Sequence, residues 1–442
     1  MPRRATGAKR VTSRRPRLQS DAVTAHPPAP AAGLPLPSLR DEFAIPVHQG
    51  DPVAYFCGNS LGLMPRATPA ALERVTEQWR LHAVEAHFTD ADAWMPYHEL
   101  VRDGLARLAG AKPLEVVAMN TLTTNLHLMM VSFYRPVRQR RKILIEARAF
   151  PSDRHAVASQ IRFHGGDPAT DLIELAPRPG THTIDIEQVA DVLQREGERI
   201  ALVLWPGVQY ASGQRFDLEA IAALGHAQGC AVGFDLAHAI GNVPVDLHAS
   251  GADFAVWCSY KYLNAGPGAI AGCFVHERHA QADLPRFAGW WGHQQATRFQ
   301  MGPEFIATPG AEGWQLSNPS IFSLAPLRTS LALFDRVGLT ALRERSVALT
   351  GWLADAIDAE LRAHLEILTP ADPWQRGCQL SLRVRQGRDA GRRAFDQLSR
   401  NGIVCDWREP DVIRASPVPL YNEIDDCRRL VDCLARHFGS MA

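Results

Sequence analysis

One lysine of this chain stands where an amine could do chemistry. Lysine and arginine together number 47, but lysine occurs only at Lys9, Lys112, Lys142 and Lys261. Arginine keeps its proton in proteins, whereas a lysine amine can lose its proton and attack an aldehyde. In the stretch SYKYLNAGPG, Lys261 follows a short apolar run and precedes a turn rich in glycine and proline. Lys261 is therefore a candidate Schiff-base lysine; the alternative is an ordinary solvated side chain at a strand end.

Two further features could act together with this amine. Asp235 closes the apolar run CAVGFDLAH, where a buried carboxylate is costly unless a cation meets it. Small hydroxyl residues around Thr123 follow the run EVVAMN and begin a predicted helix. A helix N-terminus with hydroxyl donors can bind an anion. The alternative is an ordinary helix N-cap, which has the same sequence pattern. Pyridoxal phosphate would account for all three positions, because its aldehyde needs a lysine, its ring nitrogen a carboxylate and its phosphate a helix N-terminus.

A sheet of α/β type is expected to position these residues. Short β-rich runs such as KILIEA, RIALVLWP and DFAVWCS alternate with segments of helical spacing between about residues 66 and 318. The runs are almost continuously apolar, which is typical of strands covered on both faces in a mostly parallel sheet. Ligands bind such sheets at the carboxyl ends of the strands, so we expect Asp235 and Lys261 to face one site.

The pattern divides the chain into four segments. Residues 1–40 are rich in arginine and proline and are predicted to be a disordered tail; a transit peptide and a start codon placed too early are the alternatives. Residues 41–65 are predicted to form an N-terminal arm and residues 66–318 the large domain. Residues 319–442, with strands and helices in shorter units, are predicted to form a smaller C-terminal α+β domain.

Composition excludes several classes of partner. The chain has 442 residues, 46% of them hydrophobic and 21% charged, with a formal net charge of zero, which does not favour nucleic acid or a membrane surface. Eight scattered cysteines without a C-x-x-C pair indicate reduced core thiols in a cytoplasmic protein. No metal site is predicted, because HERH at 276–279 has no third ligand in view.

Three consecutive segments of the chain resemble the kynureninases, a family of class V, fold-type I pyridoxal-phosphate enzymes. They are GFDLAHAIGNVPVDLH, DFAVWCSYKYLNAGPGAIAGCFVHE and RFAGWWGH. Matching blocks in the right order extend the resemblance over about residues 41–440: YFCGNSLGLMP, MNTLTTNLHLMM, FPSD, LSNPSI and SPVPLYN. The resemblance implies a large domain with a mostly parallel, seven-stranded sheet and a smaller C-terminal domain. It also implies a homodimer that shares its active sites. The implied reaction cleaves the Cβ–Cγ bond of L-kynurenine or its 3-hydroxy form, giving anthranilate or 3-hydroxyanthranilate and L-alanine, in tryptophan catabolism and NAD precursor supply.

The resemblance also assigns roles to residues of this sequence. Lys261 would bind the aldehyde and move the proton at the substrate α-carbon, Asp235 would pair with the ring nitrogen, and Tyr260 would touch the phosphate and act in proton transfer. The other implied cofactor contacts are Leu122, Thr123, Phe150, Pro151, Ser152, Asp153, His238, Trp290 and Asn318, the last two contributed by the second subunit. Pro206 stands where some members offer a hydroxyl to the phosphate, and a proline cannot donate.

Substrate contacts are implied in the same way. Arg414 would grip the carboxylate of the amino acid, for which a guanidinium fork is the physical fit. His87, Trp291 and Asn318 resemble positions that shape the aryl pocket, and the polar pair His87 and Asn318 favours 3-hydroxykynurenine as the preferred substrate.

Two other functions remain open on the sequence. A class V cysteine desulfurase or another β-lyase would need a mobile nucleophilic thiol, for which Cys378 is the only candidate, although its surroundings indicate a strand and therefore a core thiol. A non-catalytic binding protein on the same scaffold is the remoter alternative.

Overall fold

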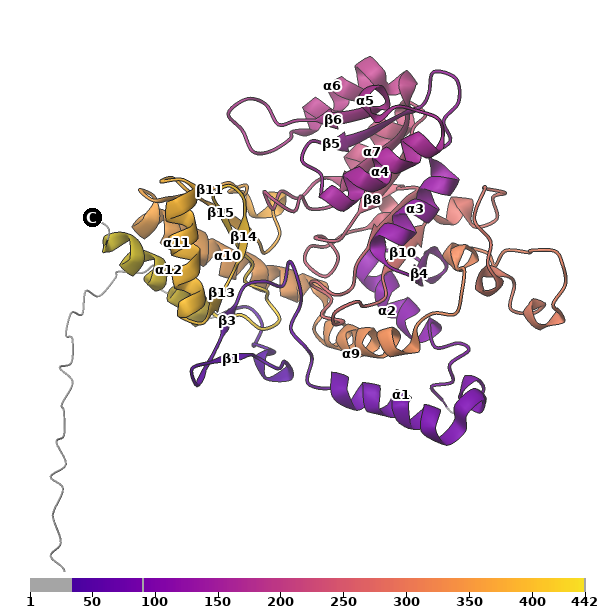
Figure 1. Ribbon diagram of the computed structural model, residues 1–442, viewed down its shortest axis with the longest axis horizontal. Coiled ribbons are helices and arrows are strands. Elements are labelled where there is room, and N and C mark those ends of the chain that lie inside the picture. The colour runs from indigo at the N-terminus through magenta and orange to yellow at the C-terminus, as the bar shows by residue number, and fades with distance from the viewer. Residues whose placement is uncertain (1–33, 90, 441–442) are drawn as a thin grey trace, which may run out of the picture.

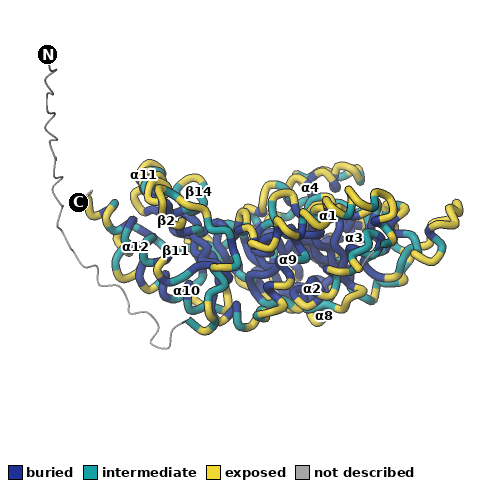
Figure 2. The backbone as a smooth tube through the Cα atoms, turned by 90° about the horizontal axis from the view of Figure 1, so that it is seen from below, coloured by how far each residue is buried: buried dark blue, intermediate teal, exposed yellow. Residues whose placement is uncertain are grey.

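A computed structural model describes residues 34–89 and 91–440 of the chain (Figure 1). Most of the predicted N-terminal tail, residues 1–33, lies outside the described residues. Within the described ranges, no helix combines the length and the apolar character needed to cross a membrane. Two regions of buried backbone adjoin each other, a larger one around α2, α3 and α9 and a smaller one around α10, α11 and α12, as Figure 2 shows.

The larger region is built on a seven-stranded sheet with the order β4-β10-β9-β8-β7-β5-β6. Neighbours from β6 through β9 pair in parallel, and only β10 runs antiparallel to both of its neighbours. The predicted mostly parallel α/β sheet is therefore confirmed. Its strands are β4 (Val116–Ala118), β5 (Lys142–Glu146), β6 (Leu172–Leu175), β7 (Ile200–Pro206), β8 (Ala231–Asp235), β9 (Phe254–Trp257) and β10 (Gly272–Val275).

Helices cover both faces of this sheet, which explains the continuous apolar runs. Alternate residues of one strand point into different cores: Val203 and Trp205 of β7 enter one, and Leu202 and Leu204 enter the other. Helices α3 and α4 pack in the core that receives Leu202, and the remaining long helices pack in the opposite core. The helices of this region are α1 (Thr68–His82), α2 (Glu99–Ala109), α3 (Leu122–Phe133), α4 (Pro151–Phe163), α5 (Pro168–Asp171), α6 (Ile186–Glu196), α7 (Leu218–Ala227), α8 (Leu247–Ser250) and α9 (Ile321–Val337).

The smaller region holds an antiparallel sheet with the order β11-β12-β15-β14, packed against three helices around its own apolar core. The N-terminal arm joins it, because β3 (Ala54–Tyr55) pairs in parallel with β13 (Ile403–Val404). A short hairpin of β1 (Val47–His48) and β2 (Asp51–Pro52) precedes that contact. The remaining elements are α10 (Leu339–Leu361), β11 (Leu365–Ile367), β12 (Leu380–Val384), α11 (Arg388–Arg400), β14 (Asp406–Arg408), β15 (Val412–Ala415) and α12 (Ile424–Gly439).

The division at residue 318 stays a prediction. Helix α9 lies after that point, yet its buried residues Leu324 and Phe334 pack in a core of the large sheet. Gly338, with a positive φ of 77°, separates α9 from α10, whose Leu353 belongs to the core of the small sheet. We therefore propose that the large domain extends through α9.

Candidate active site

A pocket of about 600 Å³, including its open mouth, lies at the carboxyl ends of β5, β7 and β8. This is the edge at which open α/β sheets bind ligands. Pro206, at the end of β7, forms part of its wall. The predicted cofactor contacts that line it are Leu122, Thr123, Phe150, Ser152, Asp153, Asp235, His238, Tyr260 and Lys261.

Lys261 enters the pocket from the turn that follows β9. Its side chain is largely buried, and Nζ lies 5.6 Å from the centroid of the Phe150 ring. The N-terminal arm supports this turn, because the Gly62 N–H donates to the Tyr260 carbonyl at 2.8 Å. A Cβ on Gly62 would lie 2.3 Å from the Lys261 carbonyl oxygen, so only glycine fits there. The block YFCGNSLGLMP therefore serves to brace the lysine turn.

Three buried carboxyl groups, those of Glu146, Asp153 and Asp235, line the same pocket as this one amine. Asp235 ends β8 and accepts a hydrogen bond from the Ala237 N–H at 2.6 Å. Burial, together with the neighbouring charge of Asp235, raises the pKa of Asp153 well above its usual range. The same two causes raise the pKa of Glu146, at the end of β5. One oxygen of Asp153 and Nδ1 of His238 have no hydrogen-bond partner among the described residues. A cationic ring nitrogen placed here would relieve this crowding of acidic groups.

The other end of the pocket is suited to an anion. Helices α3 and α4 both begin at it, at Leu122 and Pro151, and direct their free N–H groups and positive dipole ends there. The hydroxyls of Thr123 and Ser152 lie 2.8 Å apart. Burial raises the pKa of Tyr260, so this hydroxyl keeps its proton and can donate. Amine, carboxylate and anion site together fit a molecule that carries an aldehyde, a ring nitrogen and a phosphate, as pyridoxal phosphate does.

Arg414, on β15, is not among the residues that line the pocket. Its side chain is 0% exposed, its Nη1 donates to the Tyr210 carbonyl at 2.6 Å, and its Nη2 forms an ion pair with Asp406. Asp406 also pairs with Arg408 at 3.0 Å. The Tyr210 ring lines the pocket and lies 5.9 Å from the Arg414 guanidinium and 5.3 Å from the Phe150 ring. In the described part of the chain, Arg414 Nε has no hydrogen-bond partner.

Four predicted residues lie away from the pocket of their own chain. His87 packs edge-on against Trp94 at 5.3 Å, and Trp291 is buried beneath the Arg298 guanidinium at 4.6 Å. Trp290 is 41% exposed, and Asn318 is also exposed. Their roles stay predictions.

Sequence reasoning missed three residues of this region. Glu146 closes the apolar run KILIE, so the argument applied to Asp235 could have found it. Tyr210 and Asp406 carry no such signal, because each acquires its place only where the small sheet meets the large one.

Cys378 does not have the properties of a catalytic thiol. It is 0% exposed just before β12, its N–H donates to the Asn242 side chain at 2.9 Å, and burial raises its pKa to about 12. A reactive cysteine needs an accessible thiolate, so Cys378 is a core residue.

Comparisons with known proteins identify relatives of this chain. A family model described as the kynureninase C-terminal domain matches residues 342–434. A protein named kynureninase from Xanthomonas euvesicatoria pv. vesicatoria is 60% identical over 408 residues, 92% of this chain and 96% of that one. Another protein so named, from Xanthomonas oryzae pv. oryzae, is 59% identical over 407 residues, with the same coverage of both chains.

Solved structures support the fold. A cysteine desulfurase from Thermococcus onnurineus superposes with a TM-score of 0.73 at 16% identity, over 88% of this chain and 95% of that one. A C-DES variant, described with glycine covalently linked to its PLP cofactor, superposes with a TM-score of 0.72 at 18% identity, over 87% of this chain and 96% of that one. The predicted fold of the class V, fold-type I enzymes is therefore confirmed.

Proposed function

Since the chain belongs to the kynureninase family, we propose that it hydrolyses the Cβ–Cγ bond of L-kynurenine or 3-hydroxy-L-kynurenine, with pyridoxal phosphate as cofactor. The products are anthranilate or 3-hydroxyanthranilate and L-alanine. The observation that supports this most strongly is the single pocket in which Lys261 faces Asp235 and two helix N-termini.

The reaction itself tests the proposal. Purified protein supplied with pyridoxal phosphate and L-kynurenine is expected to release anthranilate and L-alanine in equal amounts. Sulfide release from L-cysteine without turnover of either kynurenine would instead assign the chain to the desulfurases, and binding without turnover would make it a binding protein.

The residues of the chain divide the chemistry between them. When bound, pyridoxal phosphate supplies an electron-withdrawing ring that takes up the charge left by removal of a proton from the substrate α-carbon. Lys261 would hold the aldehyde and then carry that proton, while Asp235 would keep the ring nitrogen protonated. Thr123, Ser152 and the N-termini of α3 and α4 would hold the phosphate. Tyr260, which keeps its hydroxyl proton, would donate to the phosphate and return a proton to the alanine fragment.

Arg414 is the proposed partner of the substrate carboxylate. Burial lowers its pKa to about 10, so the guanidinium keeps its charge at neutral pH. Asp406 bridges Arg414 and Arg408, which leaves one net positive charge for one carboxylate. The Arg414 Nε–H, which has no partner among the described residues, is a donor available to this carboxylate.

Arg414→Lys is expected to raise the KM for L-kynurenine by about 10- to 100-fold, the value of a hydrogen bond to a charged group. Lysine keeps the charge but loses the fork that engages Asp406 and a carboxylate together. Steady-state kinetics measure the effect. Arg408→Lys is the matched control. Arg408 also pairs with Asp406, but its side chain is 38% exposed, so its replacement should change the KM less. Equal KM values for the two variants would contradict the assignment.

The proposed preference for 3-hydroxykynurenine depends on Asn318. Asn318→Ala is expected to lower the ratio of kcat/KM for 3-hydroxykynurenine to that for kynurenine by about 2- to 10-fold, the value of one neutral hydrogen bond. Asn401→Ala, at the end of α11, is the control, since Asn401 is also exposed. An unchanged ratio in Asn318→Ala would show that Asn318 does not contribute to a preference for 3-hydroxykynurenine.

We also propose that the active protein is a homodimer. Trp290 and Asn318 are exposed on their own chain, which suits residues that serve the pocket of a second subunit. The surrounding segment projects from the large domain (Figure 1) and exposes an unusual number of large apolar side chains: Phe287, Phe299, Met301, Phe305 and Ile306. Such a patch is typical of a protein interface. A cytoplasmic location is proposed because all eight cysteines are buried as free thiols.

A further inference from the structure

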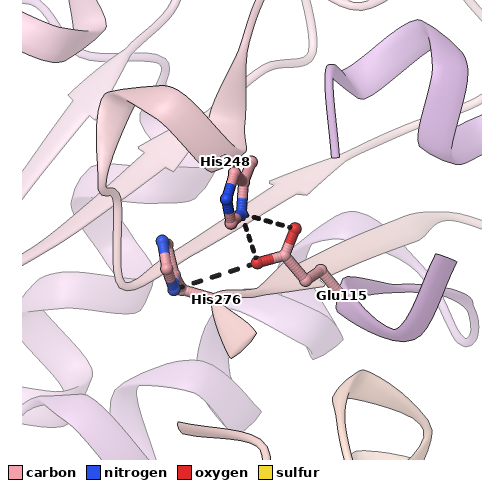
Figure 3. A group of neighbouring side chains, drawn as sticks. All are labelled: Glu115, His248 and His276. Atoms are coloured by element: carbon pink, nitrogen blue, oxygen red, sulfur yellow. Dashed lines mark hydrogen bonds and ion pairs between the residues drawn. The ribbon is translucent and has the colours of Figure 1, made fainter. Parts of the chain in front are cut away.

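Three potential metal ligands, Glu115, His248 and His276, lie close together (Figure 3). They lie at the end of the large sheet opposite the pocket. Glu115 immediately precedes β4, His276 immediately follows the antiparallel β10, and His248 lies in α8. One ligand atom from each side chain lies within 4.8 Å of the other two. Of these three, the motif HERH in the sequence pointed only to His276, because Glu115 and His248 join it through the fold.

The carboxylate of Glu115 is held in a fixed position. Its side chain is 0% exposed. One oxygen accepts from the Lys112 N–H at 2.8 Å, and the other accepts from the Glu277 N–H at 2.8 Å. Backbone donors of this kind fix a metal-binding carboxylate from behind and leave lone pairs for the metal. The carboxylate is therefore oriented before any ligand arrives.

Both imidazoles turn the same nitrogen toward this carboxylate. Nδ1 of His248 lies 3.0 Å and Nδ1 of His276 lies 3.8 Å from the same Glu115 oxygen. The rings are nearly parallel, at 20° with centroids 5.1 Å apart. The His276 side chain is 13% exposed and that of His248 is 35% exposed, so water can reach the cluster from one side.

The groups around the cluster are compatible with a cation. Nε2 of His248 points toward a Glu277 oxygen at 3.9 Å, and a ligand histidine commonly turns its second nitrogen to a carboxylate in this way. The nearby positive charges are already paired: Lys112 with Glu277 at 2.6 Å, and Arg278 with Asp253 at 2.5 Å.

We propose that Glu115, His248 and His276 form a binding site for a divalent transition metal, specifically Zn²⁺. Two imidazole nitrogens and one carboxylate oxygen, with water as the fourth ligand, are a zinc donor set, whereas Ca²⁺ and Mg²⁺ prefer oxygen ligands throughout. Zinc replaces the hydrogen bond between His248 and Glu115 and the one from the Arg278 N–H to His276 at 3.1 Å. The ion ties together three segments distant in sequence, so its role is to stabilise the fold.

Titration of the holoenzyme with ZnCl₂ in metal-free buffer, followed by calorimetry, tests the site. The expected result is one Zn²⁺ per chain at this cluster, with the affinity weakened at least about tenfold in His248→Ala and in His276→Ala. Zinc is expected to raise the Tm of the unmodified protein and to leave that of His248→Ala unchanged. His155→Ala, which removes an exposed histidine of α4, is the control and should titrate like the unmodified protein.

Cobalt gives a second measurement that does not depend on stability. Co²⁺ bound by this donor set is expected to show the intense visible bands of a four-coordinate ion, and His248→Ala should abolish them. If the unmodified protein takes up no ion, or if it and His248→Ala bind zinc and cobalt equally, the cluster is an ion pair between His248 and Glu115 only and the proposal is wrong.

Discussion

Lys261→Ala is expected to lower kcat for L-kynurenine by at least about 10³-fold. One general acid–base group contributes about 10²- to 10⁴-fold, and this substitution also removes the amine that holds the aldehyde. No other lysine can take over, because Lys261 is the only lysine that lines the pocket within the described residues. The measurement is the rate of anthranilate formation under saturating substrate and cofactor.

Lys142→Ala is the matched control for this experiment. Lys142 begins β5 and pairs with Glu196 at 3.1 Å, away from the pocket, so its removal should leave kcat within about twofold of the unmodified value. The Tm of Lys261→Ala shows whether the fold is intact. A folded Lys261→Ala protein with near-normal turnover would contradict the role of the amine.

Asp235→Asn is expected to have the second largest effect, a fall in kcat of about 10- to 1000-fold. An opposite charge at close range shifts a pKa by about 1–3 units. Loss of the carboxylate charge is therefore expected to lower the pKa of the ring nitrogen by that amount, so that a smaller fraction of the cofactor carries the proton. Asparagine keeps an oxygen that can accept from the Ala237 N–H at the end of β8, so the local turn should persist.

Two comparisons separate charge from geometry at Asp235. Asp235→Glu restores the charge at a longer reach and is expected to recover part of the lost kcat. Asp235→Asn should still attach the cofactor to Lys261, since the amine is untouched. Equal kcat values for Asp235→Asn and the unmodified protein would show that the carboxylate charge has no part in turnover.

Local patterns were enough to predict the large sheet and the centre of the pocket. The apolar strands are covered on both faces. Asp235 ends β8 and Lys261 follows the neighbouring β9, so parallel pairing of these strands brings both residues to one pocket. Thr123 was found for a similar reason, because a helix must begin where β4 ends. Asp235, Lys261 and Thr123 could be found because each stands at or just after the carboxyl end of a strand, which local sequence patterns indicate.

Residues that depend on contacts between distant segments could not be predicted in the same way. Arg414 was assigned through resemblance, but its burial, its hydrogen bond to the Tyr210 carbonyl and its pairing with Asp406 follow from the approach of the small sheet to the large one. The same holds for Glu115 and His248, which complete a cluster around a histidine that the sequence left without a third partner. Neither arrangement has a periodic signature in the sequence.

We propose that Lys261 is the residue that holds pyridoxal phosphate. Borohydride reduction of the holoenzyme, followed by proteolysis and mass spectrometry, tests it most directly, because reduction makes the bond between amine and aldehyde permanent. One phosphopyridoxyl group per chain is expected, on the peptide that contains Lys261. A label on the peptides of Lys9, Lys112 or Lys142 instead, or no label at all, would contradict it.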